Sequence, residues 1–67
     1  MRAQTKVYSE DKNLTITTLD GTLILPVGTK VTILDRQYVV ASESDVFIDP
    51  EPRDGIVATI YINLKEA

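Results

Sequence analysis

The 67-residue chain contains neither cysteine nor histidine. Without cysteine it forms no disulfide and no thiolate metal site. Without histidine it lacks the commonest metal ligand and the commonest general base. A chain this short buries only about 60% of its unfolded surface, and small domains often gain stability from disulfides, metals or association. We therefore expect one domain, residues 1–67, stabilised by regular packing or by oligomerisation.

Clusters of basic residues are also missing. The net charge is −3. Residues 41–67 carry two basic and six acidic side chains, or −4, and residues 1–40 carry five basic and four acidic ones, or +1. Nucleic-acid binding needs clustered Lys and Arg, so we expect no direct nucleic-acid partner. An acidic face suits a basic protein partner or mimicry of nucleic acid, while a charge of this size also simply keeps a small domain soluble.

Long apolar runs are absent as well. No segment approaches the roughly 18 apolar residues of a membrane span. The N-terminal stretch MRAQTKVYSE has no apolar region of the kind found in secretory signals. We expect a soluble cytoplasmic protein, in the host cytoplasm if it is viral, with no membrane partner.

What is present is a series of short strand-like runs. Thr, Val and Ile dominate these runs, polar turns separate them, and no segment has helical periodicity. This pattern predicts an all-β fold, a small single-domain barrel of about six short antiparallel strands. The candidate strands are residues 5–8, 14–19, 22–25, 29–34, 38–41, 46–48 and 56–64.

Turn signals connect these strands. Asp20-Gly21 predicts a tight hairpin, because both positions of a type I′ turn need positive φ. Polar turns are predicted at residues 35–37 and 42–45. The stretch "LPVGTKVTILDRQYVV" (25–40) resembles the pattern of SH3-like barrels, with Val31 and Ile33 facing inward. That resemblance implies a fold and no function.

The last strand, "IVATIYINL" (56–64), alternates strictly over nine residues. Such alternation predicts a strand that is buried on one side, here by the aliphatic residues at even positions. At about 3.3 Å per residue it would span roughly 30 Å, so its far end either curls around a barrel or extends to pair with another chain. The opposite face is a candidate partner-binding surface. Its residues are Val57, Thr59, Tyr61 and Asn63.

The aromatic residues have two interpretations. They either build a peptide-binding groove near the loops or lie partly buried in the core with their polar ends at its rim. They are Tyr8, Tyr38, Phe47 and Tyr61. The run Leu25-Pro26-Val27 cannot face the core at all three positions, so one or two of its side chains are expected at the surface.

The stretch "FIDPEPRDGIV" (47–57) is the most site-like part of the chain. Counted from Asp49, it places Arg53 and Ile60 where a calcium loop needs an acidic or amide residue and a glutamate. Gly55 instead fits a turn before the last strand. We expect no metal here, and either a plain connecting loop or a docking segment. The candidate acidic docking residues are Glu43, Asp45, Asp49, Glu51 and Asp54.

Catalytic groups are scarce. The serines have no histidine to activate them, the three glycines are isolated, and a domain this small provides no deep cleft. We expect no enzyme activity and no cofactor. The chain is predicted to bind protein, as a homo-oligomer or on a larger partner, by edge or face packing of residues 56–64, with the acidic segment steering a basic surface.

Two alternatives stay open. One is a virus- or mobile-element-encoded accessory protein that inhibits or redirects a host enzyme, by acidic mimicry of nucleic acid for example. It rests on what small single-domain proteins commonly do. The other is an enzyme whose active site forms only between subunits, with Lys or Tyr near a carboxylate.

Overall fold

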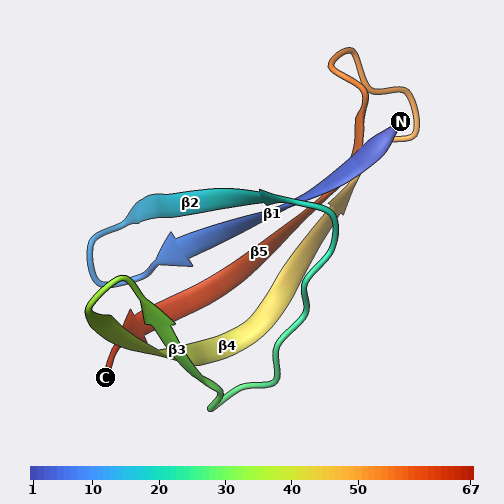
Figure 1. Cartoon of the computed structure of the whole chain (residues 1–67). Coiled ribbons are helices and arrows are strands. Elements are labelled where there is room, and N and C mark those ends of the chain that lie inside the picture. Colours follow the sequence, from blue (N-terminus) through green and yellow to red (C-terminus); the bar gives the residue numbers. More distant parts are fainter.

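One curled five-stranded sheet makes up the fold in the computed structural model, which describes residues 1–67 (Figure 1). There are no helices, so the all-β prediction is confirmed. The order across the sheet is β2-β1-β5-β4-β3, with five strands where about six were predicted. Their bounds are β1 (Arg2–Ser9), β2 (Leu14–Asp20), β3 (Lys30–Ile33), β4 (Arg36–Ile48) and β5 (Ile56–Glu66).

Strand β5 occupies the centre of the sheet. It pairs antiparallel with β4 along one edge and parallel with β1 along the other. The prediction that all strands are antiparallel is therefore wrong. Both backbone edges of β5 are thus paired within the chain, which leaves its outer face as the part of the strand that is open to a partner. The alternation was interpreted correctly, because Ile60, Ile62 and Leu64 are buried.

The predicted hairpin at Asp20-Gly21 is wrong. Gly21 has φ +86°, but β2 ends at Asp20 and residues 22–25 form no strand. The Gly21 N–H donates to the Ala3 carbonyl (2.9 Å), and the Thr5 hydroxyl donates to the Gly21 carbonyl (2.8 Å). The same hydroxyl oxygen accepts the Leu23 N–H (3.0 Å). The buried Thr5 thus takes up backbone groups that a hairpin ladder would need, and the chain leaves the sheet.

Two other turn predictions need correction. Residues 42–45 do not end a strand but lie within β4, where the pairing with β5 shifts register on either side of Ser42. A β-bulge takes up extra polar residues while the strand continues, which explains why two predicted strands are one. The turn before β4 is one residue earlier than predicted, at Leu34-Asp35, because Ile33 pairs directly with Arg36.

The core lies on the inner face of the curl. It consists of Val7, Tyr38, Val40, Ile62 and Leu64, contributed by the three central strands. Both edge strands add to it: Ile16 comes from β2, and Val31 and Ile33 come from β3, so the predicted inward pair is confirmed. Leu25 also packs there, while Pro26 and Val27 are exposed, as expected for that apolar run.

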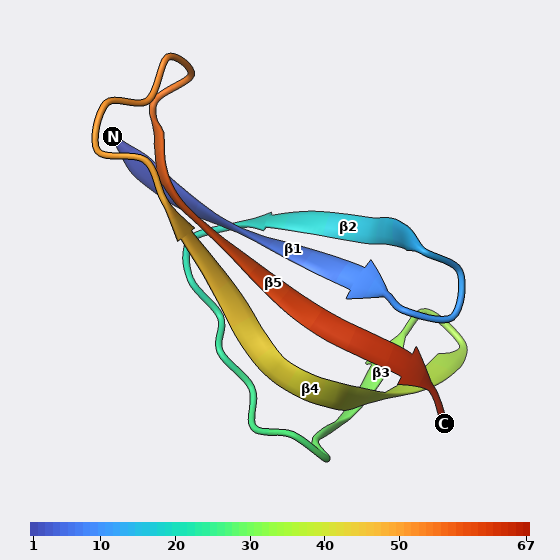
Figure 2. The ribbon, with the colours of Figure 1, turned by 180° about the vertical axis from the view of Figure 1, so that it is seen from behind.

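The curl does not close into a barrel. The outermost strands β2 and β3 have no partner on their outer edges, so the sheet is a half-barrel. Segment 21–29 spans the opening and runs beside β4 from the end of β2 to β3 (Figures 1 and 2). It bonds to β4 only at Val40, through Gly28 and Thr29. Most of β4 beyond Val40 is therefore open on that side.

Candidate functional site: an aromatic groove on the outer face

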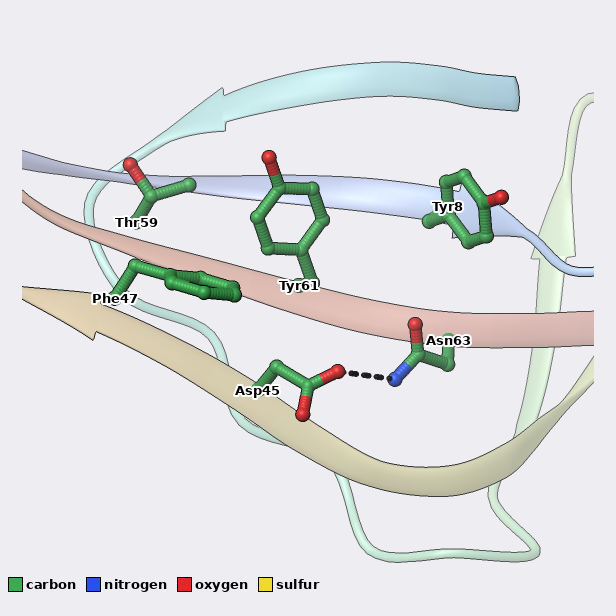
Figure 3. Close-up of a pocket in the computed structure, with 6 residues that line it drawn as sticks. All are labelled: Tyr8, Asp45, Phe47, Thr59, Tyr61 and Asn63. Atoms are coloured by element: carbon green, nitrogen blue, oxygen red, sulfur yellow. Dashed lines mark hydrogen bonds between the residues drawn. The ribbon is translucent and has the colours of Figure 1, made fainter. Parts of the chain in front are cut away.

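A shallow groove crosses the three central strands on the outer face of the sheet (Figure 3). Its volume is about 410 Å³. Strand β1 contributes one lining residue, β4 two and β5 three. They are Tyr8, Asp45, Phe47, Thr59, Tyr61 and Asn63.

Strand register explains why these side chains meet. Side chains two positions apart on a strand share a face, and directly paired residues lie side by side. Asp45 is paired with Tyr61 and Phe47 with Thr59, while Tyr8 is paired with Asn63 across the parallel edge. The groove is thus a direct product of the alternation in β5 and of its central position.

The ring of Tyr61 is at the middle of the groove. Phe47 meets it edge to face, with 5.5 Å between ring centroids and 86° between ring planes. The Lys6 ammonium lies 5.9 Å from the Tyr61 centroid, within cation–π range. Tyr61 is half-buried, but Phe47 is 61% exposed. The sheet therefore holds an apolar ring in water with its orientation fixed by a neighbouring ring.

Polar side chains on both sides of the rings are also fixed. Asn63 Nδ2 donates to Asp45 Oδ2 (3.3 Å), as drawn in Figure 3, and to the Glu43 carbonyl (3.2 Å). Gln4 Nε2 donates to Thr59 Oγ1 (3.3 Å). The Tyr8 hydroxyl is bonded to Asn13 Oδ1, in the turn that follows β1. Preset side chains of this kind lose little conformational freedom when a ligand binds.

Sequence reasoning identified part of this groove. Thr59, Tyr61 and Asn63 line it, and Asp45 from the acidic set joins them. Val57, the fourth predicted residue of β5, is half-buried and does not line it. Tyr8 and Phe47 were considered as aromatics but not selected, because their faces depend on pairings that the sequence does not reveal.

Tyr38 fits the second interpretation of the aromatic residues, that of a core residue. It is buried in the core cluster, from the opposite face of β4 to Phe47. The two residues are an odd number of positions apart, and the two register shifts between them restore the alternation, so their side chains lie on opposite faces. Because residues 42–45 looked like a turn, the alternation of β4 could not be followed from one aromatic to the other.

The remaining acidic residues do not converge on the groove. Asp49 Oδ1 accepts the Glu51 N–H (3.0 Å), and Asp54 Oδ1 accepts the Ile56 N–H (2.9 Å). These bonds shape the loop between β4 and β5, which lies beside the N-terminus in Figure 1. Gly55 has φ +81°, as predicted for the turn before the last strand. No three acidic side chains of the molecule come together as a metal-binding group.

None of the five acidic residues forms an ion pair. The three ion pairs join Arg2 to Asp20, and Lys12 and Arg36 to Glu66, all outside residues 43–54. Glu43, Asp45, Asp49, Glu51 and Asp54 are opposed in that segment only by Arg53, which gives it a charge of −5 + 1, or −4. The groove thus borders a segment whose negative charge is opposed within that segment only by Arg53, while the Lys6 ammonium lies over the Tyr61 ring in the groove.

The groove combines apolar, aromatic and polar groups. It offers aromatic rings, a carboxylate that accepts hydrogen bonds and an amide side chain, at the surface of a rigid sheet. Such a combination suits a ligand that presents apolar and cationic groups together.

Comparisons with known proteins give no relative: no family model, curated protein or solved structure matches the chain. The structure contains no helix capable of crossing a membrane.

Proposed function

We propose that the chain is a small non-catalytic protein-binding module that holds a basic protein partner against the aromatic groove. The observation that carries this proposal is the exposure of Phe47 beside Tyr61. A core role does not explain it, because the core lies on the other face. Aromatic residues are enriched among those that contribute most of the energy at protein interfaces.

The charge around the groove defines the partner. Asp45 lines the groove and Glu43 adjoins it, and neither has an ion-pair partner. A Lys or Arg of the partner would reach the Asp45 carboxylate beside the exposed ring of Phe47, since the Lys6 ammonium already lies over Tyr61. A second copy would bring the same carboxylates toward each other. A different, basic protein therefore fits better than self-association, and no feature of the molecule favours the inhibitory alternative over it.

Affinity capture from the native source, with matched variants, tests this function. Phe47→Asp places a charge in the groove and is expected to abolish capture. Leu34→Asp is the control, because Leu34 is an exposed apolar residue in the turn before β4, remote from the groove lining, and the substitution adds the same charge. Capture that both variants lose equally would make the effect one of charge alone and would reject the groove.

Self-association is tested separately. Light scattering after size exclusion, across a range of concentrations, is expected to give a mass near 7.4 kDa. A dimer or larger assembly that Phe47→Asp dissociates would assign the groove to a second copy and contradict the basic partner. Higher salt should weaken capture, because the carboxylates contribute through long-range attraction.

A further inference from the structure

The edge of β4 from Ser42 to Ile48 has no neighbouring strand. β3 pairs only with residues 36–39. Segment 21–29 adds bonds only at Val40, where Gly28 and Thr29 meet it. The other edge of β4 is fully used by β5. One long strand thus presents a paired edge and, over its second half, a free one.

The register shows which backbone groups face that free edge. The Asp49 N–H donates to the Val57 carbonyl (2.9 Å). In an antiparallel pair, residues that exchange hydrogen bonds alternate with residues that do not. Phe47 shares the parity of Asp49 and bonds toward β5, so Val46 and Ile48 direct their N–H and C=O groups outward. Such an edge is a template for an added strand.

Apolar surface lies next to this edge. A cavity of about 550 Å³ separates it from segment 21–29, between residues 24–27 and residues 43–46. Figure 2 shows that segment running alongside β4. Val46 is 51% exposed and Ile48 66% exposed, and Ile24 and Val27 are also more than half exposed. A strand placed here would bury every second side chain against aliphatic residues.

The charges on the edge select what can add to it. Glu43, Asp45 and Asp49 are on or next to the free stretch and have no ion-pair partners. Two such edges brought together would oppose like charges across the new pair, which disfavours a second copy of this chain. A strand with Lys or Arg at its alternate positions would instead form opposite-charge pairs.

We propose that the free edge of β4 binds an extended segment of a basic protein as an added strand, in which aliphatic residues alternate with Lys or Arg. The aliphatic side chains lie beside Val46 and Ile48, and the basic ones lie on the side of Asp45. This site is distinct from the aromatic groove, with which it shares only Asp45. The free edge provides a second mode of contact, which does not depend on binding at the aromatic groove.

The direct test uses a synthetic peptide of sequence KVKVKVK with blocked ends. A scrambled peptide of the same composition, VVKKKVK, is the control for charge alone. Saturation of the wild-type chain with the alternating peptide is expected to slow hydrogen exchange of the Val46 and Ile48 amides at least about tenfold. Exchange at those amides that is unchanged, or slowed equally by the scrambled peptide, would overturn the proposal.

A proline variant tests the backbone contact. Val46→Pro removes an N–H that faces outward, a position where edge strands tolerate proline. It is expected to keep the fold and to weaken binding of the alternating peptide by at least about tenfold. Phe47→Pro is the matched contrast, because it removes an N–H that bonds to β5 and should disrupt the sheet. Wild-type affinity in a folded Val46→Pro chain would reject strand addition.

Charge reversal gives a second readout that does not depend on proline. The double variant Glu43→Lys with Asp45→Lys is expected to prefer the peptide EVEVEVE over KVKVKVK, and an unchanged preference would contradict the proposed charge selection. Two variants distinguish this edge site from the aromatic groove. Tyr61→Ala should leave binding of the alternating peptide intact, whereas Val46→Pro should leave capture through the groove intact.

Discussion

The two halves of β4 differ although they form one continuous strand. Residues 36–40 pair with β3 or segment 21–29 on one side, residues 38–40 pair with β5 on the other, and Tyr38 and Val40 belong to the core. Residues 42–48 pair with β5 alone, and their three apolar residues are all more than half exposed. The bulge at residues 41–45 marks the boundary. The first half is built for stability, and the second half has apolar side chains that stability does not require.

The two halves show how a small chain divides its apolar residues between core and surface. Only nine of the 67 residues are buried, so each core position matters. The exposed Val46 and Ile48 would add to the core if the half-barrel closed over them, whereas Phe47 lies on the outer face. Val46 and Ile48 remain outside the core because segment 21–29 crosses the opening without pairing there. Exposed apolar groups that adjoin one another, as Val46 and Ile48 do with residues 24–27, mark candidate interaction surfaces.

The largest expected effect is a loss of stability on replacing a valine in the first half of β4, compared with a valine in the second half. Val40 is 1% exposed and Val46 is 51% exposed. Val40→Ala removes buried methyl groups and leaves a cavity, so it should lower the free energy of unfolding by about 2 kcal/mol. Val46→Ala should change it by less than about 0.5 kcal/mol. Urea denaturation measures both. Equal losses would mean that the two halves of β4 do not differ in this way and that Val46 belongs to the core.

A smaller effect is expected at the turn that leads into the first half. Leu34 has φ +55° and is 93% exposed, so its side chain gains little from packing in return for a left-handed backbone. Leu34→Gly should raise the free energy of unfolding by roughly 0.5–1 kcal/mol, because glycine adopts positive φ without steric cost. Thermal denaturation checks the sign. A loss of stability would mean that Leu34 packs more tightly than its exposure indicates.

The sequence predicted the parts of this fold that depend on local pattern. Strict alternation over residues 56–64 identified β5, its buried face and the side of Tyr61, and Gly55 identified the turn before it. What it missed depends on contacts distant in the chain. Thr5 takes the backbone groups that would have closed a hairpin at Asp20-Gly21. The parallel pairing of β1 with β5 joins strands about 50 residues apart and has no local signature.

The candidate site shows the same division. Tyr61 and Asn63 were found because alternation assigns them to one face. Phe47 was missed because the bulge in β4 hides its relation to Tyr38. The free edge of β4 was missed entirely, since residues 42–45 looked like a turn. Edge and centre are properties of strand order, and strand order follows from long-range pairing that composition and periodicity do not specify.

The smallest expected effect asks whether the second half of β4 contributes to stability through its outer face. Phe47 and Tyr61 are the one aromatic pair that links β4 to β5. A double-mutant cycle with Phe47→Leu and Tyr61→Leu keeps apolar side chains at both positions and isolates the ring contact. The coupling energy should be about 0.5 kcal/mol, the low end for edge-to-face pairs, because Phe47 is largely exposed. The same cycle with Phe47→Leu and Lys6→Met should give a smaller coupling energy, since Lys6 contacts Tyr61 and not Phe47.

A coupling energy near zero for the aromatic pair would mean that the rings are held in place by the strands alone. The ring contact would then contribute nothing to folding, and the place of Phe47 beside Tyr61 would have to be explained by binding.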